Sequence, residues 1–293
     1  MKIGLQVPSF TYPGGTPVIG SKLAEIARTA DDAGFSSLWV MDHFFQIRGV
    51  GTAEEPMLES YGALNFMAAH TKKVRLGTMV TGVIYRYPGL LVKAVSTLDV
   101  LSGGRAYFGI GAAWNEEESR GLGVNFPPVK ERFERLEEAL QIALQMWSGK
   151  ENAYNGKYYH LERTLNSPQP LSKPHPPILI GGSGEKKTLL LVAKYANACN
   201  LFGRQGADVL RHKLQILRDH CEKVGRDYNE IEKTALETVN LGTGGMTAQQ
   251  MIDQCRELSA LGFQHVIVNM PNVFEIRPLE IIGREVIPAV AGL

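Results

Sequence analysis

Small and polar residues follow a short apolar run near the middle of the chain. The segment Arg105-Ala-Tyr-Phe-Gly-Ile-Gly-Ala-Ala-Trp-Asn-Glu-Glu-Glu118 begins as a buried strand, loses its side chains at Gly109 and Gly111, and continues into acids that open a helix. A backbone that carries glycine can approach a flat ligand closely. We therefore expect this strand end to form one wall of a site for a planar molecule.

Asp42 and His43 follow another apolar run. They could serve as metal ligands, as an acid and a base, or as polar contacts to a cofactor. Neighbours on a strand point to opposite faces, which does not suit two ligands of one ion. The sequence holds no HxH or HExxH motif, so we predict no metal site. His43 can titrate near neutral pH, which makes it a candidate acid or base.

Two further segments allow a binding role and a plain structural one. Gly181-Gly-Ser-Gly184 precedes a helix expected from residue 186, and a glycine loop that leads into a helix N-terminus binds phosphate. An ordinary tight turn has the same composition, so both interpretations stand. Among the acids at 116–118, we interpret Glu117 and Glu118 as neutralising a helix dipole, and Asn115 is better placed as a cofactor contact.

Strand patterns alternate with helix patterns along the whole chain, which predicts a parallel sheet. A closed (β/α)8 barrel and an open doubly wound sheet compete. Eight strands, with no Gly-x-Gly-x-x-Gly after the first, favour a single TIM-barrel domain over residues 1–293, whose chemistry lies at the carboxyl ends of its strands. The expected strands are 3–7, 37–41, 74–80, 106–110, 177–180, 198–202, 235–241 and 265–269, and the helices 21–33, 61–70, 90–101, 130–147, 186–195, 207–224 and 248–261.

The segment 149–176 lacks periodicity and holds four prolines, so we interpret it as an insertion before the fifth strand, with a functional or lid-like role.

The net charge of +1 argues against a nucleic-acid partner. Cys199, Cys221 and Cys255 are far apart and without a CxxC, which suggests neither disulfides nor a zinc ribbon. Without a signal-peptide pattern or a run of about 18 apolar residues, we expect a cytoplasmic protein that does not enter the membrane.

Several segments, in order, resemble the bacterial luciferase-like monooxygenase superfamily, and specifically its branch that depends on the deazaflavin coenzyme F420. They are Leu38-Trp-Val-Met-Asp-His43, Leu76-Gly-Thr-Met-Val-Thr-Gly82, Arg86-Tyr-Pro88, Leu98-Asp-Val-Leu-Ser-Gly-Gly-Arg105, Gly109-Ile-Gly-Ala-Ala-Trp-Asn-Glu116, Glu131-Arg-Phe-Glu-Arg-Leu-Glu-Glu138 and Pro177-Ile-Leu-Ile-Gly-Gly-Ser-Gly184. The resemblance covers nearly the whole chain.

This resemblance implies a barrel that holds a deazaflavin or flavin at its C-terminal face. In similar enzymes the third strand carries a bulge with a non-proline cis peptide behind the ring, which falls here at Met79 and Val80. By similarity, Asp42 contacts the polar edge of the ring, and Gly181, Gly182, Ser183 and Gly184 receive the phosphate. The ring or its ribityl chain is contacted by Gly109, Gly111, Ala112 and Asn115.

Ala112 departs from one pattern of the superfamily. Deazaflavin-dependent sugar-phosphate dehydrogenases resemble this chain but have a glutamate at this position, which is proposed as a proton donor. Its absence points away from glucose-6-phosphate oxidation. The proton partner then lies elsewhere, with His43 as the best remaining candidate, or the substrate or water supplies the proton. Trp114 beside the ring would suit an apolar or unsaturated substrate.

The resemblance therefore implies an oxidoreductase that moves a hydride between F420 and a small organic substrate. An FMN-dependent two-component monooxygenase is the alternative, and a non-catalytic flavin-binding relative is disfavoured by the polar strand ends. The helices at 61–70 and 90–101 are more apolar than one buried stripe requires. Members of this family commonly pair through them, so we expect a homodimer; packing on the barrel alone is the alternative.

Overall fold

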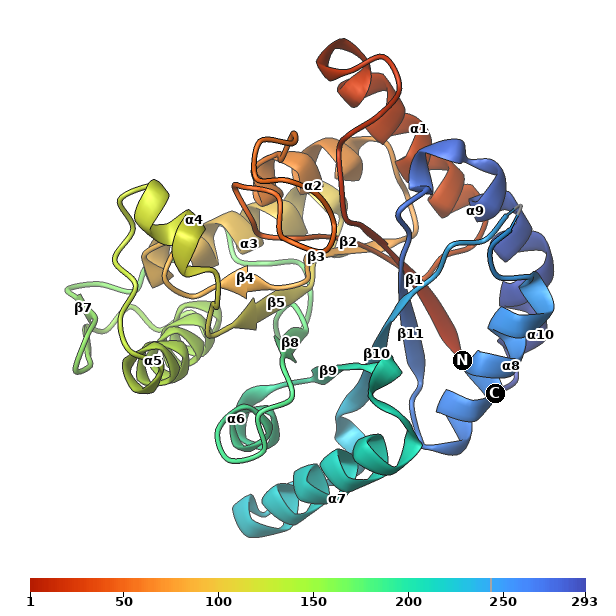
Figure 1. The fold of residues 1–293 in the computed structure, drawn as a ribbon. Coiled ribbons are helices and arrows are strands. Elements are labelled where there is room, and N and C mark those ends of the chain that lie inside the picture. The colour runs from red at the N-terminus through yellow and green to blue at the C-terminus, as the bar shows by residue number, and fades with distance from the viewer. Residues whose placement is uncertain (243) are drawn as a thin grey trace.

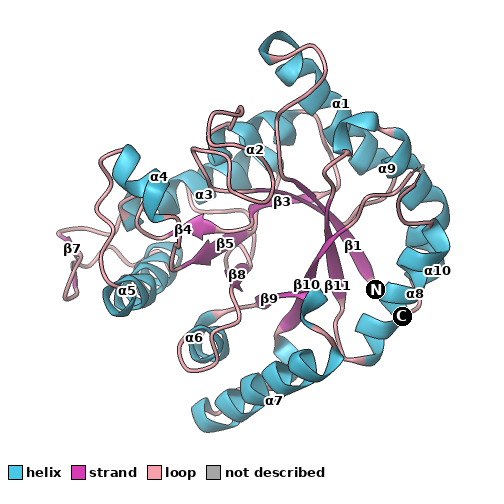
Figure 2. Cartoon of the chain, viewed as in Figure 1, coloured by secondary structure: helices cyan, strands magenta, loops and turns pink. Residues whose placement is uncertain are grey.

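The computed structural model describes residues 1–242 and 244–293. In it, parallel strands form a barrel that is surrounded by helices (Figures 1 and 2). The strands of the barrel are β1 (Lys2–Val7), β2 (Ser37–Val40), β3 (Arg75–Thr78), β4 (Thr81–Gly82), β5 (Phe108–Gly111), β8 (Ile178–Gly181), β9 (Ala198–Phe202), β10 (Glu232–Thr238) and β11 (His265–Asn269). The helices are α1 (Ile19–Asp32), α2 (Ser60–Ala69), α3 (Pro88–Ser102), α4 (Glu116–Gly121), α5 (Val129–Trp147), α6 (Thr188–Tyr195), α7 (Ala207–Val224), α8 (Ala248–Ala260), α9 (Arg277–Ile281) and α10 (Ile287–Val290).

The sheet closes because β3 and β4 are two parts of one interrupted strand. The strand order is β3-β2-β1-β11-β10-β9-β8-β5-β4, so β3 and β4 lie at its two ends. Leu76 of β3 also bonds to the segment before β5, since its N–H donates to the Arg105 oxygen at 2.8 Å and its oxygen accepts from the Tyr107 N–H at 2.7 Å. Counting β3 and β4 together gives eight strand positions, and the predicted (β/α)8 barrel is confirmed.

The interruption between β3 and β4 contains the predicted non-proline cis peptide, between Met79 and Val80. Glycines make room for it. The Thr78 oxygen lies 1.9 Å from where a Cβ on Gly109 would be, and Val80 methyl carbons lie 2.9 Å from the corresponding points on Gly111 and Gly181. These glycines therefore accommodate the neighbouring strand. Of the two glycines that we expected to admit a ligand, Gly111 also lines the cavity described below, and Gly109 does not.

The interior of the barrel is closed below the site by a small cluster of large side chains. Trp39 is fully buried, and its ring centroid lies 5.1 Å from that of Tyr107. Leu179, Ala198 and Ile267 complete this cluster, with Met79, Val80 and Leu236 packed against it. A larger apolar core fills the space between strands and helices. These side chains fill the barrel interior beneath the cavities at the carboxyl ends of the strands.

Most predicted elements are present, with shifts at their ends. Helix α6 begins at Thr188 and not at residue 186, so three residues of turn separate it from the glycine loop. Strand β10 covers Glu232–Thr238 where we expected 235–241. The strand begins with two polar residues, Glu232 and Lys233, so its start was not evident from the sequence. These residues belong to the strand because they pair with Ala198 and Cys199 of β9.

The insertion at 149–176 contains a short hairpin of β6 (Tyr154–Asn155) and β7 (His160–Leu161). It is fastened to the outside of the barrel: the Ser172 N–H donates to Asp99 Oδ2 of α3 at 2.8 Å, and Asn166 donates to Ser96 at 3.0 Å. Within the described chain, no residue of 149–176 lines the two cavities at the carboxyl ends of the strands. The functional or lid-like role of the insertion therefore stays a prediction.

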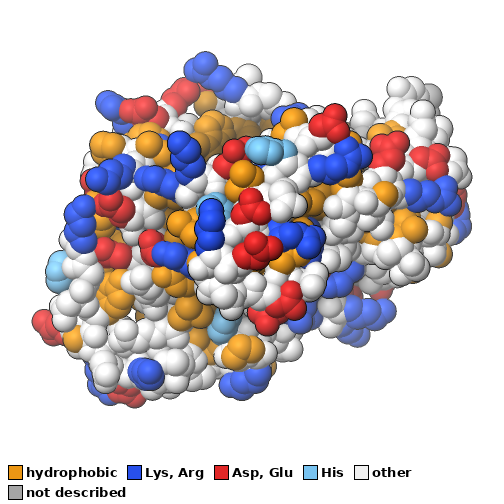
Figure 3. Space-filling model, turned by 90° about the horizontal axis from the view of Figure 1, so that it is seen from below, with side chains coloured by type: hydrophobic (Ala, Val, Ile, Leu, Met, Phe, Trp, Pro, Cys, Tyr) orange, Lys and Arg blue, Asp and Glu red, His pale blue; other side chains and the backbone are white. Residues whose placement is uncertain are grey.

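The mixture of charges on the surface agrees with the small net charge of the sequence. Positive and negative side chains are interspersed on the face seen in Figure 3, with apolar groups between them. Cys199, Cys221 and Cys255 are buried free thiols. Across residues 1–242 and 244–293, no helix has the length and apolar character needed to cross a membrane, and no three potential metal ligands gather at one place.

Candidate functional site

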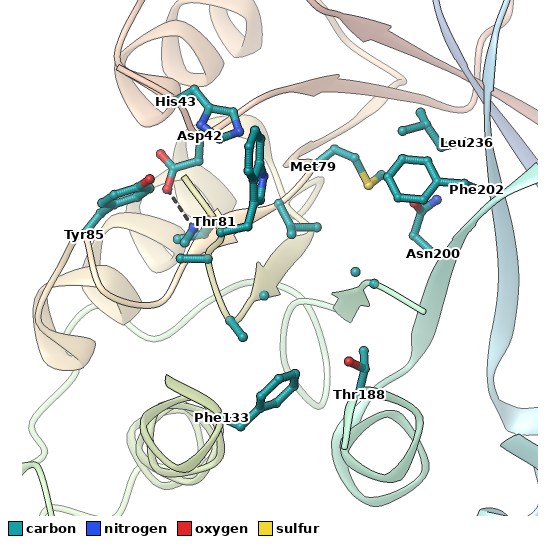
Figure 4. A pocket seen from close by; sticks show the side chains of 18 of the residues that line it. Asp42, His43, Met79, Thr81, Tyr85, Phe133, Thr188, Asn200, Phe202 and Leu236 are labelled. Carbon is teal, nitrogen blue, oxygen red and sulfur yellow. Dashed lines mark hydrogen bonds between the residues drawn. The ribbon is translucent and has the colours of Figure 1, made fainter. Parts of the chain in front are cut away.

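A cavity of about 300 Å³ opens where β4, β5 and β8 end (Figure 4). Eight of the predicted site residues line it: Asp42, His43, Met79, Val80, Gly111, Ala112, Gly181 and Gly182. The lining also includes residues that we did not predict as cofactor contacts: Thr81, Gly82, Tyr85, Ala113, Trp114, Val129, Phe133, Thr188, Asn200, Phe202 and Leu236. Most of these groups are apolar, and the few polar ones lie at separate points of the wall, as in sites for organic ligands.

The carboxylate of Asp42 is buried and held from several sides. Arg86 donates to both of its oxygens, at 2.8 and 2.9 Å, the Ser60 hydroxyl donates at 2.6 Å, and the Gly82 N–H at 3.1 Å. Burial opposes the charge of Arg86, but the nearby Asp42 outweighs it and raises the pKa of the guanidinium. Asp42 therefore fastens the end of β2 to β4 and α2, and its role at a cofactor edge stays a prediction.

His43 points away from Asp42, toward the start of α4. Its Nδ1 lies 3.1 Å from Glu118 Oε1, and its ring meets Trp114 edge-on, with 5.3 Å between centroids. The His43 side chain is 12% exposed and lines the cavity, whereas that of Glu118 is fully buried. Figure 4 shows the imidazole on the same side of the cavity as Asp42 and Tyr85.

Glu118 is the functional candidate that the sequence did not reveal. We placed it among acids at a helix N-terminus, but it points inward and accepts from the N–H groups of Phe44 and Phe45, at 2.6 and 2.9 Å, and from the Tyr85 hydroxyl. Burial acts to raise the pKa of this carboxyl. Hydrogen bonds from His43, Tyr85 and Phe45 outweigh burial, so the pKa lies below its ordinary value and Glu118 is ionised.

A second cavity of about 520 Å³ adjoins the first at the mouth of the barrel. The two share a wall of His43, Met79, Trp114, Phe202 and Leu236. Arg48, Arg204, Asn269 and Thr238 contribute polar groups to the outer cavity. His43 thus lines two adjacent cavities, which suits a proton partner between a cofactor and a substrate.

The glycine loop at 181–184 forms the other end of the first cavity. Gly182 has a φ of +115°, a conformation that favours glycine, and the Thr188 hydroxyl lies behind it. Lys213 of α7 donates to the Ser183 oxygen at 3.0 Å and lies 3.2 Å from Glu185. A largely buried ammonium group therefore supports the loop from behind, a contact that no sequence motif predicted.

Four predicted cofactor contacts lie outside the cavity lining: Gly109, Asn115, Ser183 and Gly184. Gly109 packs against Thr78, as described above. The Asn115 side chain caps α4, since its Oδ1 accepts from the Glu118 N–H at 3.3 Å. This cap helps to orient the first turn of α4, and with it the inward-pointing Glu118.

Comparison with known proteins identifies relatives across most of the chain. The model of the luciferase-like monooxygenase family matches residues 1–242. The F420-dependent glucose-6-phosphate dehydrogenase of Kineococcus radiotolerans is 34% identical over 241 residues, which are 80% of this chain and 66% of that protein. The protein of the same name from Nakamurella multipartita is 31% identical over 243 residues, 82% of this chain and 70% of the relative. The match thus spans about two thirds of the length of these relatives.

Among solved structures, an F420-dependent secondary alcohol dehydrogenase in complex with an F420-acetone adduct superposes with a TM-score of 0.83. The alignment covers 99% of this chain and 98% of that one, at 21% sequence identity. At this level of identity the likeness establishes the fold. It agrees with the strand order and closure described above.

Proposed function

Since the chain belongs to the luciferase-like monooxygenase family, we propose that it is an oxidoreductase that transfers a hydride between coenzyme F420 and a small organic substrate. The names of the relatives from Kineococcus radiotolerans and Nakamurella multipartita support F420 over FMN. The observation that carries the proposal is a single cavity lined by Gly181 and Gly182, by Met79 and Val80, and by His43, which contacts the buried Glu118.

The residues of the cavity fit a deazaflavin. Val80 and Gly111 offer a flat, mostly apolar wall to a ring, and Gly181 and Gly182 with the Thr188 hydroxyl end the cavity where a phosphate would lie. The Lys213 ammonium group behind the loop favours an anion there. A bound deazaflavin would supply a carbon centre that accepts or donates a hydride as an electron pair.

His43 is the proposed proton partner of this reaction. It lines both cavities, and its Nδ1 lies 3.1 Å from Oε1 of the buried Glu118. Ala112 lines the same cavity and offers no acid where the resemblance leads us to expect one. We therefore propose a substrate other than glucose 6-phosphate, with an apolar surface against Trp114 and Phe202.

Binding and turnover can test this function directly. The apo protein is titrated with F420 and, separately, with FMN, and fluorescence quenching reports binding; anaerobic assays with reduced and oxidised F420 then follow hydride transfer. We expect F420 to bind more tightly and turnover to need no oxygen. Tight FMN binding without F420 binding, or oxygen-dependent turnover with reduced FMN, would overturn the proposal.

We also propose that the protein forms a homodimer through α2 and α3. Most apolar residues of these helices pack on the barrel, including Leu64, Met67, Leu91, Val95 and Leu98. Phe66, Leu90 and Leu101 stay 39%, 71% and 67% exposed. These three side chains are the ones that a second copy would cover.

A further inference from the structure

The four donors around Glu118 determine how its carboxylate is oriented. The N–H groups of Phe44 and Phe45 both reach Oε2, at 2.6 and 2.9 Å. A backbone N–H can only donate, so Oε2 can only accept. The Tyr85 hydroxyl and His43 Nδ1 share the other oxygen, Oε1.

This arrangement leaves one role for His43 Nδ1. An ionised carboxylate has no proton to give, so Nδ1 must carry a proton and donate it to Glu118 Oε1, 3.1 Å away. A neutral imidazole has one protonated and one unprotonated nitrogen, and the unprotonated one is therefore Nε2. Trp114 packs edge-on against the ring and limits its rotation.

We propose that Glu118 is a positioning residue that keeps neutral His43 in the Nδ1–H tautomer, with Nε2 as the nitrogen available for proton transfer. The tautomer follows from the hydrogen bonds to an ionised Glu118 carboxylate, and its catalytic consequence rests on the proposed function. When a substrate hydroxyl is oxidised, Nε2 accepts the hydroxyl proton, the carbon-bound hydrogen leaves with its electron pair to the deazaflavin, and a carbonyl forms. In the opposite direction the protonated ring returns the proton from Nε2.

Replacement of Glu118 by glutamine gives a sharp test, because the amide is almost the same size but has a donor in place of one acceptor. The N–H groups of Phe44 and Phe45 require the amide oxygen on their side, which turns the amide NH2 toward His43. Nδ1 must then accept, and the neutral ring changes to the Nε2–H tautomer.

The experiment is ¹⁵N NMR of the histidine-labelled apo protein, with the His43 signal assigned by its loss in His43→Ala. We expect the Nδ1–H tautomer in the wild type and the Nε2–H tautomer in Glu118→Gln. The control is Glu117→Gln, an exposed neighbour that pairs with Arg48 and is expected to keep the wild-type tautomer. Tyr85→Phe removes another donor to Glu118 Oε1 and should also keep the Nδ1–H tautomer. It provides the test if Glu118→Gln does not fold.

An Nε2–H tautomer in the wild type, or an unchanged tautomer in folded Glu118→Gln, would overturn the proposal. In F420-dependent turnover we expect Glu118→Gln to reduce kcat roughly 100-fold with little change in the Kd for F420. Full turnover by His43→Ala would instead disprove the catalytic role of His43 and leave the NMR result to decide the role of Glu118. The two failures are thus distinguishable.

Discussion

The backbone oxygen of Thr78 lies 1.9 Å from the point where a Cβ on residue 109 would be, so only glycine fits beside the interruption of the third strand. The Thr78 hydroxyl also donates to the Gly109 oxygen at 2.8 Å. This pair of residues joins β3 to β5 next to the Met79–Val80 segment. The shape of the cavity wall therefore depends on a glycine that does not itself line the cavity.

Gly109→Ala should destabilise the protein by about 3 kcal/mol or more, because the clash involves backbone atoms that cannot rotate away. Thermal unfolding measures the effect. Gly20→Ala is the matched control, since a Cβ at Gly20 meets nothing within 4 Å and α1 should tolerate or favour alanine. Equal melting temperatures for the two variants would contradict the role assigned to Gly109.

Arg86→Met should reduce the free energy of unfolding by about 3–5 kcal/mol, since it leaves the buried Asp42 carboxylate without its cation. Urea denaturation gives this value. Arg48→Met should cost less than about 1 kcal/mol, because Arg48 and its partner Glu117 are 92% and 62% exposed. A similar loss in both variants would show that burial of the Asp42 pair does not matter.

Stability should fall with acid partly through Glu232, at the opposite end of the barrel from the site. Burial opposes its charge, but His265 and Lys2 outweigh burial and lower its pKa from 4.5 to about 2. Lys2 donates to it at 2.8 Å and the Tyr107 hydroxyl at 3.1 Å. Because the folded pKa is depressed, this stabilisation is complete above about pH 4.5 and is lost as the pH falls toward 2.

Glu232→Gln should therefore remove roughly 3 kcal/mol of stability near neutral pH and flatten the dependence of unfolding free energy on pH between about 4.5 and 2. Denaturation in urea at several pH values checks this. Glu230→Gln serves as the control, since Glu230 is exposed and bonds to Arg226. An unchanged slope in Glu232→Gln would rule out this carboxyl as a main source of acid sensitivity.

Lys213→Met should weaken F420 binding roughly tenfold, because it removes a charged hydrogen bond to Ser183 and a positive charge behind the proposed phosphate end. Fluorescence quenching by F420 gives the Kd. Lys223→Met, on an exposed part of the same helix, should bind like the wild type. If both variants bind F420 equally well, the phosphate does not lie at this loop.

Leu90→Glu should convert a dimer to monomers, since it places a charge among the exposed apolar residues of α2 and α3. Analytical ultracentrifugation reports the mass. Val224→Glu on α7 introduces the same charge elsewhere and should leave the dimer intact. A wild-type protein that sediments as a monomer would refute the proposed pairing.

Most of the fold was predictable because its signals are local. The strands at 198–202 and 265–269 and the helix at 207–224 agree with the structure to the residue, since apolar periodicity and flanking glycines define them. The start of β10 was missed because Glu232 and Lys233 are polar, and only pairing with β9 makes them a strand. The insertion was placed correctly, but its attachment to Asp99 and Ser96 could not be foreseen.

In the candidate site, the sequence located residues at strand ends but not the contacts between distant segments. Asp42, His43 and Gly111 line the cavity as expected. Lys213 contacts Ser183 of the glycine loop, 30 positions earlier in the chain, and the sequence around either residue does not predict this contact. Phe133 and Thr188 line the cavity from helices, where their spacing resembles that of ordinary core residues.

The order of apolar runs, turns and small residues was sufficient to establish an alternating barrel, its functional end and its family resemblance, because each of these depends on neighbours in the chain. Only the tertiary structure decided that Gly109 makes room for the backbone of Thr78 and that Glu118 contacts His43. Glu116, Glu117 and Glu118 are identical in type and adjacent in sequence. Which of them becomes a buried partner depends on where α4 meets the end of β2, and that is a property of the closed barrel.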